Sequence, residues 1–225
     1  MQIFKVYKSK YNKTEKINYD NVLKTAVISQ FSHASVPLNC ISLRVVISFC
    51  TFKKTLAALD ELKKTGAEIF PVMSEAAAST DTRFGAAEEF RKRIKEITGH
   101  EIIETIKEAE PIGPRAYLDL LIVLPCTGNT LAKTAAGIAD SAVTMAVKAH
   151  LRNSRPVLIG VSTNDGLGAA AENIGRLLVR KNMYFIPFSQ DDYIKKPNSL
   201  VAHFDKLVPA AEAAAENRQL QPIIG

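Results

Sequence analysis

The stretch LPCTGNT, residues 124–130, places small hydrogen-bonding side chains directly after an apolar run and before an Ala-rich segment. The run LDLLIVL that precedes it reads as a buried strand, and LAKTAAGIADSAVTMAV reads as helical sequence. Small residues allow a ligand to approach the backbone, and Thr and Asn supply both donors and acceptors. The pattern therefore predicts a ligand-facing turn at the end of a strand.

Three other predicted strands also end in hydroxyl or amide side chains. Ligands of open α/β sheets bind outside the carboxyl ends of the strands, where loops enter helices. Such groups suit a phosphate and a polar planar ring, although helix capping is the alternative for each loop taken alone. The candidate cofactor-binding residues are Ser48, Phe49, Cys50, Thr51, Ser74, Pro125, Cys126, Thr127, Gly128, Asn129, Thr130, Ser162, Thr163, Asn164 and Asp165.

Apolar runs alternate with amphipathic stretches from about residue 42 onward. Strands are expected at about 43–48, 67–72, 118–124, 156–162 and 183–187. Helices are expected at about 51–65, 84–98, 129–139, 141–152, 168–181 and 199–217. Continuous apolar strands that alternate with helices indicate an α/β fold, a single doubly wound parallel sheet with helices on both faces, over residues 42–225. A GxGxxG fingerprint is absent, which disfavours a conventional NAD domain.

Composition narrows the class of protein. The 225 residues are 47% hydrophobic and 23% charged, as in an ordinary globular domain. No apolar run reaches the roughly 18 residues that a membrane span needs, and the N-terminus lacks a secretory signal pattern. The three cysteines form no CxxC pair, so neither a disulfide framework nor a metal site is expected. These features predict a cytoplasmic protein.

The positive charge lies mostly at the N-terminus. Residues 1–41 carry six Lys and two acids, which accounts for four of the six net positive charges of the chain. This segment is rich in Lys, Asn and Tyr and has no periodic apolar face, which predicts an irregular extension. No clustered basic face is expected elsewhere, so nucleic acid is not a predicted partner.

Several motifs together resemble a known family. PCTGNTLAKTAAGIADSAVTMAV and STNDGLGAAAENIGRL are similar to signatures of the homo-oligomeric flavin-containing cysteine decarboxylases and their flavoprotein relatives. SFCTFKKTL, STDTRFG, EAEPIGP, KNMYFIPFSQDD, KKPNSLVA and QLQPII resemble one branch of it, the B subunits of bacterial dipicolinate synthases. The resemblance extends from Ser48 to Ile224.

The resemblance implies an oxidoreductase subunit. Such a chain acts with the A subunit of dipicolinate synthase to oxidise dihydrodipicolinate to dipicolinate, in the mother cell of a sporulating bacterium. It implies FMN on this chain, NADP on the A subunit and a homo-oligomer based on a trimer. Arg83 and Arg155 are then candidates to bind the carboxylates of the substrate, although either could be a solvated surface residue.

Two departures from the family pattern leave alternatives open. The first strand ends in Val46-Ile47-Ser48, without the glycine that lets backbone amides approach a flavin phosphate. With the odd N-terminal composition, this indicates that about residues 1–47 are unrelated to the family. The histidine used by cysteine decarboxylases is missing from residues 109–118, so no catalytic residue is assigned. An FMN-dependent decarboxylase, a flavin prenyltransferase-like enzyme and a non-catalytic scaffold subunit remain the alternatives.

Three further features have competing interpretations. Cys126 is expected to be a small buried residue rather than a redox thiol. His150 is expected to be structural or surface-exposed. The Ala-rich segment predicts close helix contacts between subunits, or alternatively packing within one subunit. Its alanines are Ala132, Ala135, Ala136, Ala139, Ala142 and Ala146.

Overall fold

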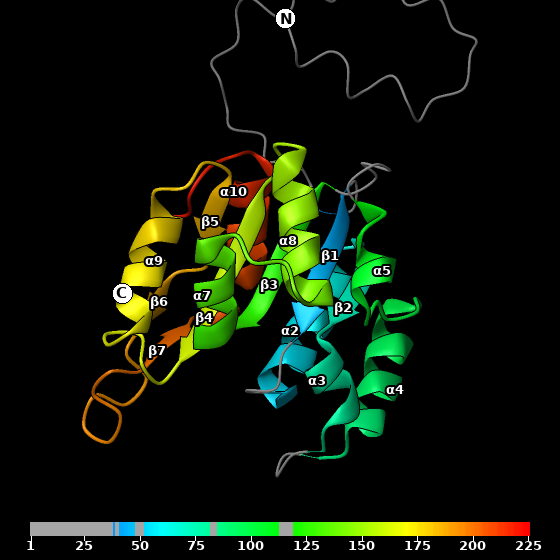
Figure 1. Cartoon of the computed structure of the whole chain (residues 1–225), viewed down its shortest axis with the longest axis horizontal. Coiled ribbons are helices and arrows are strands. Elements are labelled where there is room, and N and C mark those ends of the chain that lie inside the picture. The colour runs from blue at the N-terminus through cyan, green and yellow to red at the C-terminus, as the bar shows by residue number, and fades with distance from the viewer. Residues whose placement is uncertain (1–37, 39–40, 48–51, 82–84, 113–118) are drawn as a thin grey trace, which may run out of the picture. The chain divides into compact units, whose positions relative to one another are not determined.

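The computed structural model describes residue 38 and residues 41–47, 52–81, 85–112 and 119–225 (Figure 1). All of them belong to one compact unit that spans Ser35–Gly225. The predicted N-terminal extension lies outside the described residues except for Leu38 and Ile41, whose side chains are buried in the core. The candidate residues 48–51 and Arg83 also lie outside them.

The described strands form one seven-stranded sheet in the order β2-β1-β3-β4-β7-β6, with β5 paired to β4. The strands are β1 (Ser42–Ile47), β2 (Glu68–Met73), β3 (Leu120–Cys126), β4 (Val157–Thr163), β5 (Met183–Phe185), β6 (Phe188–Ser189) and β7 (Leu200–Ala202). The first five pair in parallel, which confirms the predicted doubly wound fold. The two short strands β6 and β7 pair antiparallel and extend the edge beside β4.

Helices cover both faces of this sheet. They are α2 (Phe52–Lys64), α3 (Glu75–Ser79), α4 (Ala87–Thr98), α5 (Ile106–Ala109), α7 (Gly128–Ala136), α8 (Ala142–Arg152), α9 (Ala170–Leu178) and α10 (Leu207–Ala215). A 3-10 turn, Phe204–Lys206, leads into α10. Among the described residues, no helix is long and apolar enough to cross a bilayer.

The prediction of a helix over 199–217 is wrong at its start. Leu200–Ala202 forms β7, and the α-helix begins at Leu207. Leu200 and Ala202 are buried, and the strand pairs with Ser162 and Thr163 at the end of β4. A run of three residues has no measurable period, so pairing with β4 decides its conformation.

Two layers of core form because successive strand residues point to opposite faces. On β3, Leu120 and Ile122 pack in the layer under α2, α4 and α10, whereas Leu121 and Val123 pack in the layer under α8 and α9. Figure 1 shows α7 and α8 in front of the sheet and α10 behind it. All seven residues of β3 are buried, which makes this strand a rigid support for the loop that follows it.

Candidate functional site

The parallel strands bring three of the predicted loops to one edge of the sheet. β1 pairs with β2 and β3, and β3 pairs with β4, so the carboxyl ends of β2, β3 and β4 lie on the same side. The structure thereby groups Ser74, residues 125–130 and residues 162–165. This edge is where open α/β sheets bind their ligands.

The loops after β3 and β4 touch each other at Gly128. A Cβ at this position would lie 3.0 Å from both Asp165 Oδ1 and Thr163 Oγ1, so a larger residue would require these two side chains to shift. The Thr163 hydroxyl donates a hydrogen bond to the Asp165 carboxylate. The Asp165 backbone amide donates to Thr163 Oγ1 over 3.4 Å. The two loops therefore form one continuous polar surface.

The N-terminus of α7 offers hydrogen-bond donors at this surface. Thr127 is the N-cap residue, but its side chain makes no capping hydrogen bond to the helix. Its hydroxyl instead lies 3.4 Å from Thr130 Oγ1. Backbone amides in the first turn of a helix have no intrahelical acceptor and carry partial positive charge. With the exposed side chain of Asn129, they can bind an anion or the carbonyl groups of a planar ring.

Helix capping is sufficient to explain Ser74. Its Oγ accepts a hydrogen bond from the backbone amide of Ala77 at 3.2 Å, and it is the N-cap of α3. The side chain is thereby committed to the helix. Of the three described loops, those after β3 and β4 remain the stronger ligand candidates.

Some of the candidate cofactor-binding residues are buried beneath the two loops and support them rather than contact solvent. Pro125, Cys126 and Ser162 are buried, with Cys126 1% exposed. Burial raises the pKa of the Cys126 thiol, which disfavours the reactive thiolate. This agrees with the interpretation of Cys126 as a small packing residue. Asn129, Asn164 and Asp165 are exposed and Thr163 is half-buried, so these are the candidate side chains that a ligand could reach.

The structure does not bring Arg155 to this site. Arg155 precedes β4, so it lies at the amino ends of the strands, at the opposite edge of the sheet. Its Nη1 is 3.4 Å from Asp119 Oδ1, and Asp119 precedes β3 at the same edge. The prediction that Arg155 binds substrate with the strand-end loops therefore has no geometric support. Its place directly before a predicted strand already indicated this position.

Arg44 and His150 form a buried pair under α8; sequence reasoning missed the burial of Arg44, whereas the structural interpretation of His150 is the one that its burial supports. Arg44 is 8% exposed, and neither its Nε nor its Nη1 has a hydrogen-bond acceptor among the described residues. His150 is 1% exposed, and its Nε2 likewise has no partner there. Arg44 Cζ lies 5.9 Å from the ring centroid of Phe70. The signal was a charged residue in the middle of an apolar strand.

The environment shifts the pKa values of this pair in the same direction. Burial lowers the pKa of Arg44 to about 10. Burial, with the nearby charges of Arg155 and Arg44, lowers the pKa of His150 to about 4, and a backbone hydrogen bond to Pro156 opposes this only in part. His150 is therefore neutral at physiological pH.

A close contact fixes the loop after β4. A Cβ on Gly166 would lie 2.6 Å from both Cβ and Cγ of the buried Leu200. We expect Gly166→Ala to lower the free energy of unfolding by about 1–3 kcal/mol, because overpacking must displace the loop or β7. Denaturant titration measures the loss. Gly168→Ala is the matched control, since its Cβ would come no closer than 3.4 Å to a neighbouring atom; equal losses in both variants would contradict the close-contact argument.

Comparison with known proteins places this geometry in a family. Residues 40–187 match the model of the family described as Flavoprotein. The solved structure of the FMN-dependent cysteine decarboxylase SpaF superposes with a TM-score of 0.59 at 23% identity, covering 80% of this chain and 99% of that one. The chain belongs to the Flavoprotein family. Because the match begins at residue 40, the interpretation that residues up to 47 are unrelated to the family is wrong for residues 40–47.

Two relatives of higher sequence identity indicate the branch of the Flavoprotein family to which the chain is similar. The dipicolinate synthase B subunit of Bacillus subtilis (strain 168) is 48% identical over 177 residues, which are 79% of this chain and 88% of the relative. The crystal structure of the dipicolinate synthase B subunit from Bacillus halodurans C is 40% identical, with a TM-score of 0.78 over 84% of this chain and 98% of that one. Within its family, the chain therefore groups with the dipicolinate synthase B subunits, as its motifs indicated.

Proposed function

We propose that this chain is the B subunit of a dipicolinate synthase, which acts with an A subunit in the mother-cell cytoplasm of a sporulating bacterium. The observation that carries the proposal is the 48% identity to a dipicolinate synthase B subunit over 79% of the chain. The polar loops after β3 and β4 lie within residues 40–187, which match the Flavoprotein family model. They meet at Gly128 to form one surface at the ligand-binding edge of the sheet.

FMN is the cofactor that we assign to this edge. The α7 N-terminus supports the assignment, because its first-turn amides lack a side-chain cap and can bind the polar edge of a flavin. The close approach at Gly128 holds the Asp165 carboxylate and the Thr163 hydroxyl against the first turn of α7, which brings polar groups of both loops together. FMN, when bound, supplies a two-electron redox centre. The loop after β1, which would hold the phosphate, lies outside the described residues.

The residues of this chain bind and orient rather than react. The exposed Asn129 amide donates and accepts hydrogen bonds, so it can fix the orientation of a ring that carries both kinds of group. Thr163 donates a hydrogen bond to the Asp165 carboxylate, which fixes the orientation of this acidic side chain at the same surface. Oxidation of dihydrodipicolinate removes one hydride and one proton, and we assign the hydride acceptor, NADP, to the A subunit.

The alternatives have less support. The FMN-dependent cysteine decarboxylase is 23% identical, a similarity that shows the fold alone. A non-catalytic scaffold subunit is the second candidate, and the specific observation that favours it is Ile47, at the position where the resemblance implies a glycine. Binding of flavin by the purified chain would decide against the scaffold.

We also propose a trimer-based homo-oligomer, in which α7 provides the contacts between subunits. Ala142 and Ala146 are buried within the subunit, so these two alanines of α8 do not serve assembly. Ala136 is exposed and Ala132 and Ala135 are half-buried. This leaves α7 as the Ala-rich surface that is open to a second copy and to the A subunit.

Replacing Asn129 tests the site. We expect Asn129→Leu to abolish the visible flavin absorbance of the purified chain and the dipicolinate formed with an A subunit, because leucine cannot replace the amide hydrogen bonds. The fold should be retained, since the side chain is exposed. Asn173→Leu, on the neighbouring helix α9, is the control and should keep both signals. Full dipicolinate synthesis by the Asn129 variant would remove this loop from the site.

A further inference from the structure

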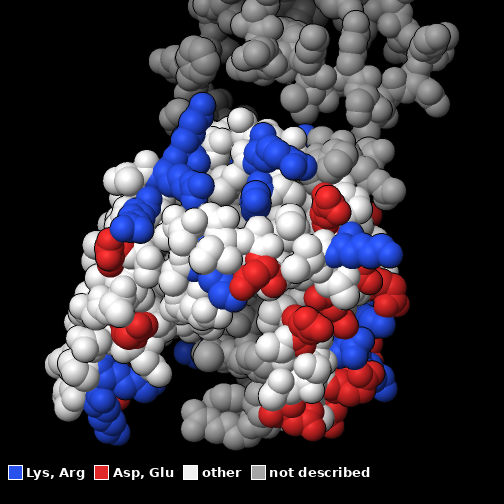
Figure 2. All heavy atoms as spheres, in the orientation of Figure 1, with Lys and Arg blue, Asp and Glu red and all other residues white. Residues whose placement is uncertain are grey.

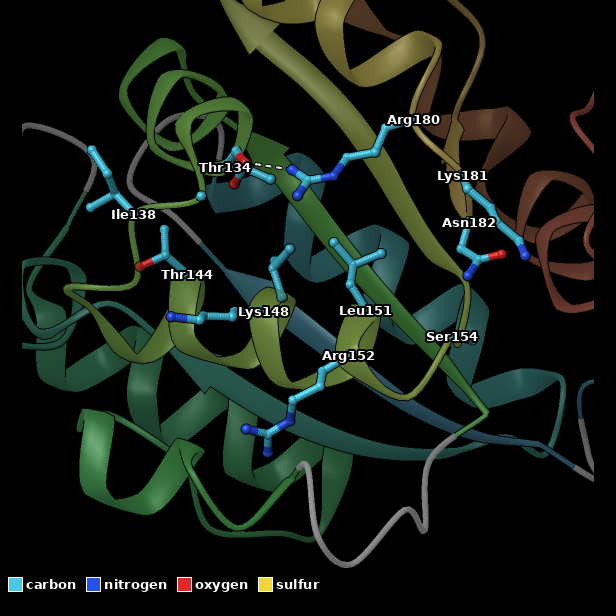
Figure 3. Close-up of a pocket in the computed structure, with 12 residues that line it drawn as sticks. Thr134, Ile138, Thr144, Lys148, Leu151, Arg152, Ser154, Arg180, Lys181 and Asn182 are labelled. Atoms are coloured by element: carbon cyan, nitrogen blue, oxygen red, sulfur yellow. Dashed lines mark hydrogen bonds between the residues drawn. The ribbon is translucent and has the colours of Figure 1, made fainter.

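We propose that a groove between α7, α8 and the turn before β5 binds a small organic anion, one with an apolar body and at least two negative groups. The groove has a volume of about 470 Å³, within the range of small-molecule sites. Its lining residues belong to α7 and the turn after it, to α8 and the turn after it, and to residues 180–182 before β5. Figure 3 shows that they come from three segments of the chain, with the Arg180 guanidinium turned towards Thr134.

Four of these residues are cations. Lys148 and Arg152 lie on α8, and Arg180 and Lys181 follow α9. No carboxylate lines the groove, and within the described ranges none of the four forms an ion pair. Figure 2 shows blue side chains over the end of α8 and over the turn after α9, with white atoms between them. The expectation that no basic face forms outside the N-terminal segment is therefore wrong.

Neutralisation of helix ends explains only part of this charge. The Arg180 guanidinium donates to the backbone carbonyl of Thr134 at 3.0 Å and so satisfies the C-terminal end of α7. Arg152 lies in the last turn of α8, where a cation is favourable. Lys148 lies earlier in α8 and Lys181 beyond the end of α9. Both are exposed, and they leave a surplus of positive charge that an anion can use.

Part of the lining of the groove is aliphatic. Ile138, Val147 and Leu151 line it, and Ile138 is 48% exposed. Gly137 adds no side chain, and a Cβ there would meet nothing within 4 Å. A groove whose lining combines these aliphatic side chains with cations fits a ligand with an apolar body and charged edges better than it fits a hydrated inorganic ion.

The groove is separate from the flavin site that we propose. Arg180 and Lys181 lead into β5, and Ser154 leads towards β4, so the groove lies towards the amino ends of these strands. The loops after β3 and β4 lie at the carboxyl ends. A ligand in the groove would therefore bind without displacing a molecule at the strand-end site, as an effector does.

Pyridine-2,6-dicarboxylate is a suitable probe, because it has an apolar ring and two carboxylates. The choice of this probe rests on the proposed function, whereas the argument for the groove does not. Titration of the purified full chain by calorimetry, in metal-free buffer because the probe chelates divalent cations, should give a Kd of about 1 mM or tighter. Lys148→Glu and Lys181→Glu should each weaken binding by about tenfold or more, since each removes a charge-assisted interaction and adds repulsion. Lys54→Glu, an exposed lysine on α2, is the control and should leave the Kd unchanged.

Two further arms distinguish the groove from the strand-end site and from a surface that binds any polyanion. Asn129→Leu should keep the binding event that Lys148→Glu and Lys181→Glu weaken, whatever the probe does at the strand-end site. Loss of all probe binding in the Asn129 variant, with binding kept in the Lys148 and Lys181 variants, would place the anion at the strand-end site and overturn the proposal. Inorganic pyrophosphate should bind more weakly than the probe, and equal binding would refute the role of the aliphatic side chains. Absence of probe binding would refute the groove without touching the proposed function, which dipicolinate synthesis tests independently.

Discussion

Lowering the pH from 7 to 4 should remove about 3 kcal/mol from the free energy of unfolding through His150 alone. In the folded chain, burial under α8 and the charges of Arg155 and Arg44 lower the pKa of His150 from 6.5 to about 4. In the unfolded chain, the imidazole titrates at its ordinary value. Between these two pKa values the unfolded chain binds a proton that the folded chain rejects.

The sign follows from this difference in bound protons. Stability from the neutral His150 is fully present above pH 6.5 and decreases as the pH falls towards 4. Chemical denaturation at several pH values measures it, and His150→Gln, which does not titrate, should show a loss that is smaller by about 3 kcal/mol. Arg44→Met should reduce the loss partly, because one of the charges that lower the pKa is gone. Parallel pH profiles for His150→Gln and the unaltered chain would contradict a buried neutral histidine.

Arg44→Met should stabilise the chain by about 2 kcal/mol and raise the Tm by roughly 4–8 °C. Arg44 is buried on the face that α8 covers, and its Nε and Nη1 have no acceptor among the described residues. An unpaired buried charge is strongly unfavourable, and methionine of similar length keeps the apolar contacts of the stem. The contact with Phe70, at 5.9 Å, offsets only about 1–2 kcal/mol of that penalty.

An exposed arginine provides the control for this substitution. Arg176 on α9 pairs with Glu172 at 2.6 Å, and its side chain is 59% exposed. Surface ion pairs of this kind contribute little, so Arg176→Met should change the stability by no more than about 0.5 kcal/mol. A lower Tm for Arg44→Met would mean that Arg44 has a counter-charge from another molecule or from residues outside the described ranges.

Much of the sheet could be predicted because its central strands are continuous apolar runs. β1, β3 and β4 each fall within two residues of the expected bounds, since strands buried on both faces need apolar side chains throughout. β6 was not predicted because it has only two residues, and β7 was not predicted because its apolar residues also suit the helix expected over 199–217. They form because they pair with β4 and with each other, and these partners are distant in the sequence.

The candidate site follows from topology more than from single residues. Loops after parallel strands must meet at one edge, so the proximity of residues 125–130 and 162–165 was predictable. The role of each side chain was not. Ser74 caps α3, and Gly128 is required by the approach of Asp165 and Thr163. Such contacts depend on loop geometry that no local pattern encodes.

The basic groove could not be found along the chain. Lys148 and Arg152 are four residues apart on α8, whereas Arg180 and Lys181 follow a different helix. When charges are summed over a stretch of sequence, these four cations are cancelled by acidic residues of the same stretch. In the folded chain those acidic residues do not line the groove. Charge patterns therefore predicted the composition of the surface but not its distribution.

Reconstitution with an A subunit tests the central claim most directly. The chain should be co-expressed with a dipicolinate synthase A subunit and supplied with dihydrodipicolinate and NADP, and pyridine-2,6-dicarboxylate should be quantified. We expect dipicolinate to form when both chains are present and to fall to the background of the A subunit alone when this chain is omitted or carries Asn129→Leu. Equal dipicolinate synthesis by the A subunit with and without this chain would contradict the function proposed here.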